Sequence, residues 1–324
     1  SVQGIQGNFR VNVQMSDLTK KEMIWSKIYD FRNNNDIFEI QDELGNSILR
    51  LFNVKFAGGF DPNISRNMSV YKKFIYGQSA FNKKTIEGTN RAEKLWKEAL
   101  ALEPNNSRLG AFLGWIHWRK VTLGMTSNAK EDMEKAYEYA LEAMQKNERW
   151  ANPVVLVGLI ELFSGKHDVA CARIPKLVEL SRNVTEISMT AIVQHSCGYL
   201  EDTIRSYEHV FLVNPHYSSW VKYMYAYALT EKKDYEKAKA FSTEQLKKKH
   251  NWSGVEKTLY IVLAYIHKKQ GSEKLAKEMF EMQRKNDGKS LTAQQIHKGF
   301  ISKKDKTFLN DIIETLKPFG LPDQ

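Results

Sequence analysis

Apolar and polar side chains alternate near the start of the chain. Between residues 9 and 15 every second side chain is apolar, at Phe9, Val11, Val13 and Met15. A period of two is typical of a β-strand with one buried face. A polar, turn-like stretch follows over residues 17–22, and the segment from Met23 to Tyr29 has the composition of a second strand. The pattern therefore predicts an N-terminal β-hairpin.

The hydrophobic period changes after this hairpin. Asp36, with Glu39 three residues later, has the spacing of a capping box and predicts a helix that runs to about Phe52. Its apolar stripe consists of Ile37, Ile40, Leu44, Ile48 and Leu51. Two strands and one helix bury too little surface to be stable alone. We therefore expect residues 1–56 either to dock on the rest of the chain or to be part of a larger α/β module, with a linker over residues 57–69.

From residue 70 onward the chain repeats itself with a period of about 34 residues. A small residue in one predicted helix is followed, usually twelve positions later, by a second small residue and then by a bulky one. The pairs are Gly77 with Ala92, Gly114 with Ala136, Gly158 with Ala170, Ala191 with Thr203, Ala226 with Ala238, and Ala264 with Ala276. The first two pairs have longer turns. This pattern resembles the tetratricopeptide repeat and predicts about six helical hairpins over residues 70–285.

Close approach of two helices explains the pattern. Helices in a hairpin cross where both side chains are small, because a larger side chain would force them apart. Tyr207 and Phe280, at the bulky position, are expected to fill the gap to the next hairpin. An amphipathic helix from Thr307 to Lys317, within a tail of residues 286–324, is expected to cap the last hairpin. The predicted fold is mostly α: a tetratricopeptide-like α–α superhelix with a small N-terminal β-hairpin and helix, the remnant of an α/β module.

The tetratricopeptide resemblance also implies a binding surface. In such arrays the concave groove is lined by positions three before, one after and four after the small residue of each first helix. Many of these positions are aromatic here, and Trp and Tyr offer a large rigid contact area with a polar group. The predicted partner-binding groove contains Phe74, Phe81, Trp115, Trp118, Leu159, His195, Tyr223, Tyr227 and Tyr265. The groove is expected to receive a peptide or a helix, with segments of the same chain among the candidates. The alternative is that these rings pack against the N-terminal strands and helix or against adjacent hairpins, and for Trp115 and Trp118 both placements are open.

The N-terminal segment resembles a second family. Trp25, Tyr29 and Asp30, followed by Asp36-Ile-Phe-Glu-Ile-Gln-Asp-Glu43, are similar to the region that joins the catalytic head to a tetratricopeptide tail in bacterial class III adenylate/guanylate cyclases. The ending Phe319-Gly-Leu-Pro-Asp323 is also similar to the ends of those proteins. The resemblance implies a regulatory region of a cyclase-like signalling protein whose catalytic domain is absent from this chain. The same module resembles segments of transcriptional regulators with winged-helix heads, so a scaffold region of such a regulator is the alternative.

A net charge of +10 raises the question of nucleic-acid binding. The excess lysines are spread along predicted helices with acidic neighbours, as at Lys232, Lys233 and Asp234. This distribution is typical of solvated helix faces, and no nucleic-acid binding motif accompanies it, so no nucleic-acid partner is expected. The expected partner is a protein or peptide, with the missing head domain of the same protein as one candidate. An unpaired strand edge also favours a homodimer.

The location of the protein is predicted from its termini, hydropathy and cysteines. No stretch approaches the roughly 18–20 apolar residues that span a bilayer, and the start lacks the features of a secretory signal. It also lacks an initiator Met, as expected of a processed chain or an excised piece. Cys171 and Cys197 are too few for a disulfide framework and are expected to be buried free thiols. A cytoplasmic protein is therefore expected.

Candidate catalytic chemistry is sparse. The eight histidines show no metal-ligand spacing, and each is expected to be a surface residue or a satisfied core residue. Gly4 and Gly7 lack the Lys-Ser/Thr pair that follows a phosphate-binding loop. We therefore expect no catalytic residue, no metal and no cofactor in this chain, and an interaction function instead.

Overall fold

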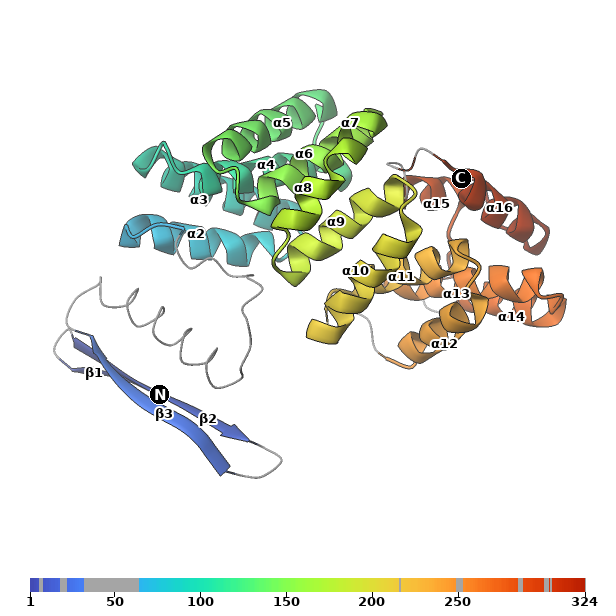
Figure 1. The fold of residues 1–324 in the computed structure, drawn as a ribbon, viewed down its shortest axis with the longest axis horizontal. Coiled ribbons are helices and arrows are strands. Elements are labelled where there is room, and N and C mark those ends of the chain that lie inside the picture. The colour runs from blue at the N-terminus through green and yellow to red at the C-terminus, as the bar shows by residue number, and fades with distance from the viewer. Residues whose placement is uncertain are drawn as a thin grey trace. The chain divides into compact units, whose positions relative to one another are not determined.

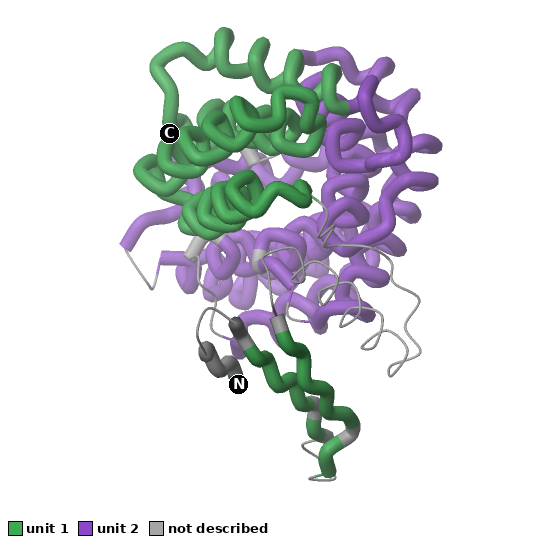
Figure 2. Tube along the Cα trace, turned by 90° about the vertical axis from the view of Figure 1, so that its left-hand side faces the viewer, with its two compact units in different colours: residues 1–143 green, residues 144–324 purple. Residues whose placement is uncertain are grey.

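The structure, a computed structural model, describes residues 1–5, 8–17, 22–31, 64–215, 217–248, 253–284, 288–299, 303 and 305–323. They divide into two compact units, residues 1–143 and 144–324 (Figure 2). The predicted helix over residues 36–52 and most of the predicted linker lie outside the described residues. The described part is mostly helical, with repeated hairpins and a small N-terminal antiparallel sheet (Figure 1). This confirms the predicted fold class.

Unit 1 begins with an antiparallel sheet in the order β1-β2-β3. β2 (Asn8–Asp17) pairs with β3 (Glu22–Phe31) in the predicted hairpin. Across this pair, Arg10 Nε lies 2.6 Å from Asp30 Oδ1, and both side chains are exposed. β1 (Val2–Ile5) pairs with the start of β2 and is absent from the prediction, because its 4 residues are too few to show an alternation.

The helices of unit 1 start with polar caps. α2 (Met68–Phe81), α3 (Ile86–Leu102) and α4 (Ser107–Thr122) are followed by α5 (Ala129–Lys146), whose end belongs to unit 2. The side chains that accept hydrogen bonds from the first N–H groups of α2, α3 and α4 are those of Asn67, Thr85 and Asn106. Such caps satisfy donors that have no partner within the helix, so they fix where each helix begins.

The crossing of α2 and α3 is sterically tight. A Cβ atom placed at Gly77 would lie 2.3 Å from Trp96 Nε1. At this distance no side chain fits unless the indole ring of Trp96 is displaced. Trp96 is fully buried, and its indole N–H donates to the carbonyl oxygen of Phe74 at 3.1 Å. The small residue at this position of the repeat is therefore a steric requirement in the first hairpin.

Unit 2 continues the series of hairpins. In its first hairpin the second element is split into two short helices, and Pro175, which lacks an N–H, stands in the first turn of the second of them. None of the described helices is both long and apolar enough to cross a membrane. The helices are α6 (Ala151–Phe163), α7 (His167–Ala172), α8 (Ile174–Leu180), α9 (Val184–Ser196), α10 (Leu200–Val213), α11 (Ser219–Glu231), α12 (Tyr235–Leu246), α13 (Ser253–Lys269), α14 (Glu273–Met282), α15 (Ala293–Gly299) and α16 (Thr307–Leu316), which continues into a short 3₁₀ turn, η1 (Lys317–Phe319).

The first helices α4, α6, α9, α11 and α13 all end in the same way. The second residue after each helix has a left-handed backbone with φ between 65° and 85°, at Gly124, Gly165, Gly198, Lys233 and Gly271. The residue after it donates its N–H back across the turn, as Asp234 does to the carbonyl of Leu229 at 2.9 Å. This is the Schellman motif, which satisfies carbonyls at the helix end. Glycine occupies this position in four of these five turns, and this recurrence was a signal in the sequence that the prediction did not use.

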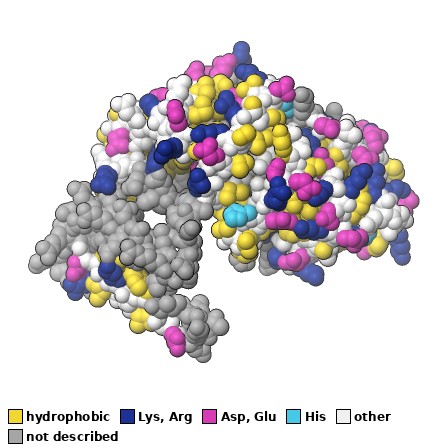
Figure 3. All heavy atoms as spheres, in the orientation of Figure 1, with side chains coloured by type: hydrophobic (Ala, Val, Ile, Leu, Met, Phe, Trp, Pro, Cys, Tyr) yellow, Lys and Arg dark blue, Asp and Glu magenta, His cyan; other side chains and the backbone are white. Residues whose placement is uncertain are grey.

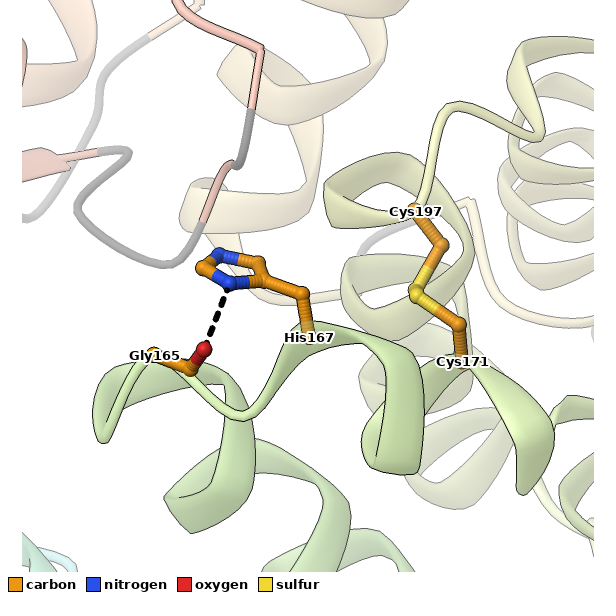
Figure 4. Close-up of a disulfide and its surroundings, with 4 residues drawn as sticks. All are labelled: Gly165, His167, Cys171 and Cys197. Atoms are coloured by element: carbon orange, nitrogen blue, oxygen red, sulfur yellow. Dashed lines mark hydrogen bonds between the residues drawn. A yellow bond between two sulfur atoms is a disulfide. The ribbon is translucent and has the colours of Figure 1, made fainter.

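A disulfide joins two successive hairpins. Cys171 on α7 and Cys197 at the end of α9 are bonded, with their Cα atoms 5.8 Å apart (Figure 4). The same figure shows His167, also on α7, with its Nδ1 3.1 Å from the Gly165 carbonyl oxygen. The prediction of two free thiols is therefore wrong. A separation of 26 residues resembles no local cysteine motif, and only the stacking of one hairpin on the next brings the two sulfur atoms together.

Lys233 is the exception among the glycines, and replacing it should stabilise the protein. An L-residue in the left-handed region is strained by about 1–2 kcal/mol, part of which glycine recovers. We expect Lys233→Gly to raise the free energy of unfolding by about 1 kcal/mol in urea titrations. Lys247→Gly is the matched control, because Lys247 ends α12 in a right-handed conformation (φ −76°) and its replacement should lower stability. A loss of stability in both variants would contradict the strain at Lys233.

Reduction of the disulfide should destabilise unit 2. Closing a loop of 26 residues removes conformational entropy from the unfolded chain, which corresponds to roughly 3–4 kcal/mol. Urea unfolding with and without dithiothreitol measures the difference. A Cys171→Ser/Cys197→Ser variant should resemble the reduced protein and show no response to dithiothreitol. Equal stability of the oxidised and reduced native protein would contradict the prediction.

Candidate functional site

Surface charges lie among charges of the opposite sign. On the face drawn in Figure 3, Lys and Arg side chains are interspersed with Asp and Glu rather than gathered in one basic area. Within single helices, Lys97 Nζ is 2.7 Å from Glu93 Oε1, and Lys248 Nζ is 2.7 Å from Glu244 Oε1. The charged surface on this face therefore contains no concentrated patch of one sign among the described residues, and the predicted groove residues are the better candidate site.

Two predicted groove residues of unit 1 belong to its core. Phe74 on α2 is buried, with its ring centroid 5.0 Å from that of Phe112 on α4. The ring of Phe81, at the end of α2, lies 5.3 Å from that of Trp96. The Arg119 guanidinium lies 3.1 Å from the centroid of the Phe81 ring and also donates to the Phe81 carbonyl oxygen. Both phenylalanines therefore hold α2 against α3 and α4.

The two tryptophans of α4 have an intermediate position. Trp115 and Trp118 are both half-buried, so part of each ring remains at the surface. Arg119, which follows them, is desolvated, and burial lowers its pKa to about 10. The surface of α4 thus combines partly exposed indole rings with a cation that is already engaged by Phe81.

His117 lies on a different side of α4 and is a satisfied core residue. Its Nδ1 is 2.5 Å from Asp132 Oδ1 on α5, and its ring stacks on that of Tyr139 with centroids 5.8 Å apart. Burial lowers the pKa of His117, although the hydrogen bond to Asp132 opposes this. Lys120 reaches α3 and pairs with Glu93 at 2.6 Å. These contacts join α4 to its neighbours. They also show that His117, one of the eight histidines without metal-ligand spacing, is a core residue with polar partners.

Unit 2 holds the other predicted groove residues. Leu159 on α6, His195 on α9, Tyr227 on α11 and Tyr265 on α13 are all buried. Tyr223 on α11 is half-buried, and burial raises its pKa to about 12. We call the side of α9, α11 and α13 that carries His195, Tyr227 and Tyr265 the inner face. In Figure 1, α15 and α16 lie on the α11 and α13 side of the stack, away from α12 and α14.

The inner face is covered by the chain's own C-terminal segment, described at residues 303 and 305–323. The Phe308 ring, at the start of α16, meets two tyrosines edge to face, with centroids 6.2 Å from Tyr227 and 5.8 Å from Tyr265. Asp311, one turn further on, accepts a hydrogen bond from the Tyr265 hydroxyl at 2.6 Å and pairs with Lys269 at 2.7 Å. The opposite side of α16 is in the core of unit 2 through Leu309, Ile312, Ile313 and Leu316.

A buried lysine extends this contact to α9. Lys303 has only 4% of its surface exposed and forms an ion pair with Glu231 at the end of α11. The other oxygen of Glu231 is 2.8 Å from His195 Nε2. Burial would raise the pKa of Glu231, but His195 and Lys303 together lower it. Burial lowers the pKa of His195, with Glu231 opposing and Lys303 reinforcing that shift.

Three of the predicted groove residues belong to this cluster, and their role in binding a partner stays a prediction. The prediction placed His195, Tyr227 and Tyr265 on one face, and the structure brings them under one segment. It missed Glu231 and Lys269, each five residues after the small residue of its helix, because only three positions per helix were considered. Lys303, Phe308 and Asp311 were not identified as partners, because the sequence did not indicate which segment of the chain would occupy the groove.

Among the described residues, no three His, Cys, Asp or Glu side chains come together in a way that could hold a metal ion. The Glu231 carboxylate is held between a lysine and a histidine, and the tyrosines of the inner face have raised pKa values, mainly because burial disfavours the phenolate. Such groups hold their partners in fixed protonation states, which suits recognition of another side chain.

The His195 site should make stability depend on pH. The pKa of His195 is below its ordinary value of 6.5, so between these values the folded protein binds fewer protons than the unfolded chain. The free energy of unfolding should therefore be highest above pH 6.5 and fall as the pH drops below it. His195→Gln should reduce this slope in urea titrations from about pH 7 to about pH 5, with a remaining slope from His117, whose pKa is also lowered. His209→Gln, on the exposed side of α10, should leave the native slope unchanged, and an equal slope in all three proteins would exclude the proposed cause.

Comparisons with known proteins give remote structural similarity. No protein-family model matches the chain, and no curated protein matches it in sequence. A solved structure from a functional characterisation of Pseudomonas aeruginosa pilF is 14% identical, covering 67% of this chain and 93% of that chain, with a TM-score of 0.48. A tetratricopeptide repeat protein from Parabacteroides merdae is 15% identical, covering 78% of this chain and 100% of that chain, with a TM-score of 0.39. The tetratricopeptide domain of P58(IPK) is 10% identical, covering 77% of this chain and 65% of that chain, with a TM-score of 0.30.

Proposed function

We propose that this chain is a non-catalytic protein-interaction region that binds a peptide or protein partner on the side of its first helices that carries the predicted groove residues. One observation carries the proposal: the inner face of α9, α11 and α13 holds a polypeptide segment through an ion pair, an aromatic contact and a hydrogen bond. A surface that recognises one segment with these three kinds of contact has the chemistry to recognise another. In repeat proteins, neighbouring hairpins commonly build such extended binding surfaces.

The partly exposed aromatic residues support the same function. Trp115 and Trp118 in unit 1 and Tyr223 in unit 2 occupy predicted groove positions and are only half-buried. Aromatic side chains with a polar group dominate the energetics of many interfaces, since they bury much apolar area with few rotatable bonds. Each unit therefore offers aromatic contacts for a partner, and the two sets can be tested separately.

The partner proposed more specifically is a signalling head domain. The resemblance of Trp25, Tyr29 and Asp30, together with residues 36–43, to the linking region of class III adenylate/guanylate cyclases supports a regulatory role beside such a head. Trp25, Tyr29 and Asp30 lie on β3. This proposal places the chain in the cytoplasm, where thiols are kept reduced. The Cys171–Cys197 disulfide is instead typical of an oxidising compartment, so quantifying thiols in protein isolated under acid quench from its own cells tests this location.

A selection from displayed random peptides tests the interaction function. We expect the native chain to enrich peptides that bind it, and Trp118→Ala or Tyr223→Ala to weaken the peptides of its own unit by about tenfold or more. Tyr76→Ala is the matched control, because Tyr76 on α2 is 60% exposed and outside the predicted groove. Circular dichroism shows whether the variants remain folded. Failure to enrich any peptide, or equal binding by all folded variants, would contradict the proposal.

A further inference from the structure

The C-terminal segment makes two separable sets of contacts. Leu309, Ile312, Ile313 and Leu316 are buried in the core of unit 2 and anchor α16. Lys303 and Phe308 instead contact side chains of the first helices α11 and α13. Phe308 is only half-buried, so it contributes less burial than the anchoring residues. The inner-face contacts can therefore be exchanged while the apolar anchor of α16 stays in place.

The Lys303 position is built for a cation. Glu231 and His195 come from two different helices, and both oxygens of Glu231 are engaged, one by each neighbour. A buried ion pair is rarely more stabilising than apolar side chains of similar volume, whereas removing one partner is costly. A segment that only capped the last hairpin would need no such pair. The buried carboxylate therefore specifies which side chain occupies the position.

An aromatic position lies beside the cation position. The edge-to-face contacts of Phe308 with Tyr227 and Tyr265 form a slot for one ring. The two positions are occupied by side chains five residues apart in sequence. The pattern read by the inner face is thus a lysine, four intervening residues and an aromatic residue.

We propose that Lys303 and Phe308 are a built-in ligand of the inner face, and that the partner is a peptide segment with the same lysine and aromatic pattern, which competes with them. This proposal rests on the proposed interaction function and gives its partner a chemical class. In the resting chain the positions are filled, so the partner binds only as its lysine and ring replace Lys303 and Phe308. Binding is thereby limited by competition from within the same chain.

The test uses the full chain and a labelled synthetic peptide with the sequence of residues 303–310, followed by fluorescence anisotropy. We expect weak binding to the native chain and binding at least about tenfold tighter to Lys303→Met/Phe308→Ala, in which Glu231 lacks its cation and the aromatic position is empty. A peptide in which the lysine at position 303 is alanine should lose this gain, and so should the variant that also carries Glu231→Gln. Lys317→Ala removes an exposed lysine of the same segment and should bind as the native chain does.

Each outcome decides the proposal. A folded double variant that binds no more tightly than the native chain overturns it, as does a gain that persists with the peptide lacking its lysine. If the double variant does not fold, Lys303→Met alone is measured, and the same two outcomes apply to it. If this competition fails while the selected peptides still depend on Trp118 for binding, the general interaction function is retained and only the competition proposal is lost. Failure of both experiments removes both proposals.

Discussion

The separation of the two helices in a hairpin is set by the smallest side chains at their crossing, and the remaining packing adjusts to it. At Gly77 this constraint is strict, because an added Cβ atom would lie 2.3 Å from Trp96 Nε1. At Gly158 it is lenient, because the nearest atom, Val193 Cγ2, would be 3.8 Å away, an ordinary contact. The same repeat position thus tolerates different degrees of substitution. This explains how the repeats can diverge in sequence while the hairpin geometry persists.

The sequence predicted what depends on local spacing. The small residues, the alternation of β2 and β3, and the amphipathic stripe of the last helix are read within one or two turns of chain, so they could be placed before the structure. Contacts between distant segments could not. Lys303 and Glu231 are 72 residues apart, and Cys171 and Cys197 are 26 apart. Neither pair has a local pattern, since each depends on how successive hairpins stack.

The inner face shows why groove positions alone do not define a binding site. Tyr227 and Tyr265 were predicted to line an open groove, yet both are buried and contact the ring of Phe308 from the chain's own C-terminal segment. The predicted positions point toward the groove side of each first helix, whereas the burial of a side chain depends on the segment that packs against it. Charge adds the selectivity that aromatic area lacks, because Glu231 at one end and Lys269 at the other fix the direction of the segment that lies between them. A segment laid in the reverse direction would bring Lys303 toward Lys269 and Asp311 toward Glu231.

In a stack of repeats, each hairpin is stabilised mainly by its neighbours, so unfolding can start at any weak junction and propagate. The bond between Cys171 and Cys197 prevents unfolding from starting at one of these junctions, because the hairpin of α6, α7 and α8 cannot separate from α9 while the bond is closed. His195, which contacts the Glu231 carboxylate, stands two residues before Cys197 on the same helix turn. Opening of the disulfide would therefore first loosen the end of α9 that orients His195. The oxidation state of the two cysteines thus affects how firmly the cation position of the inner face is held.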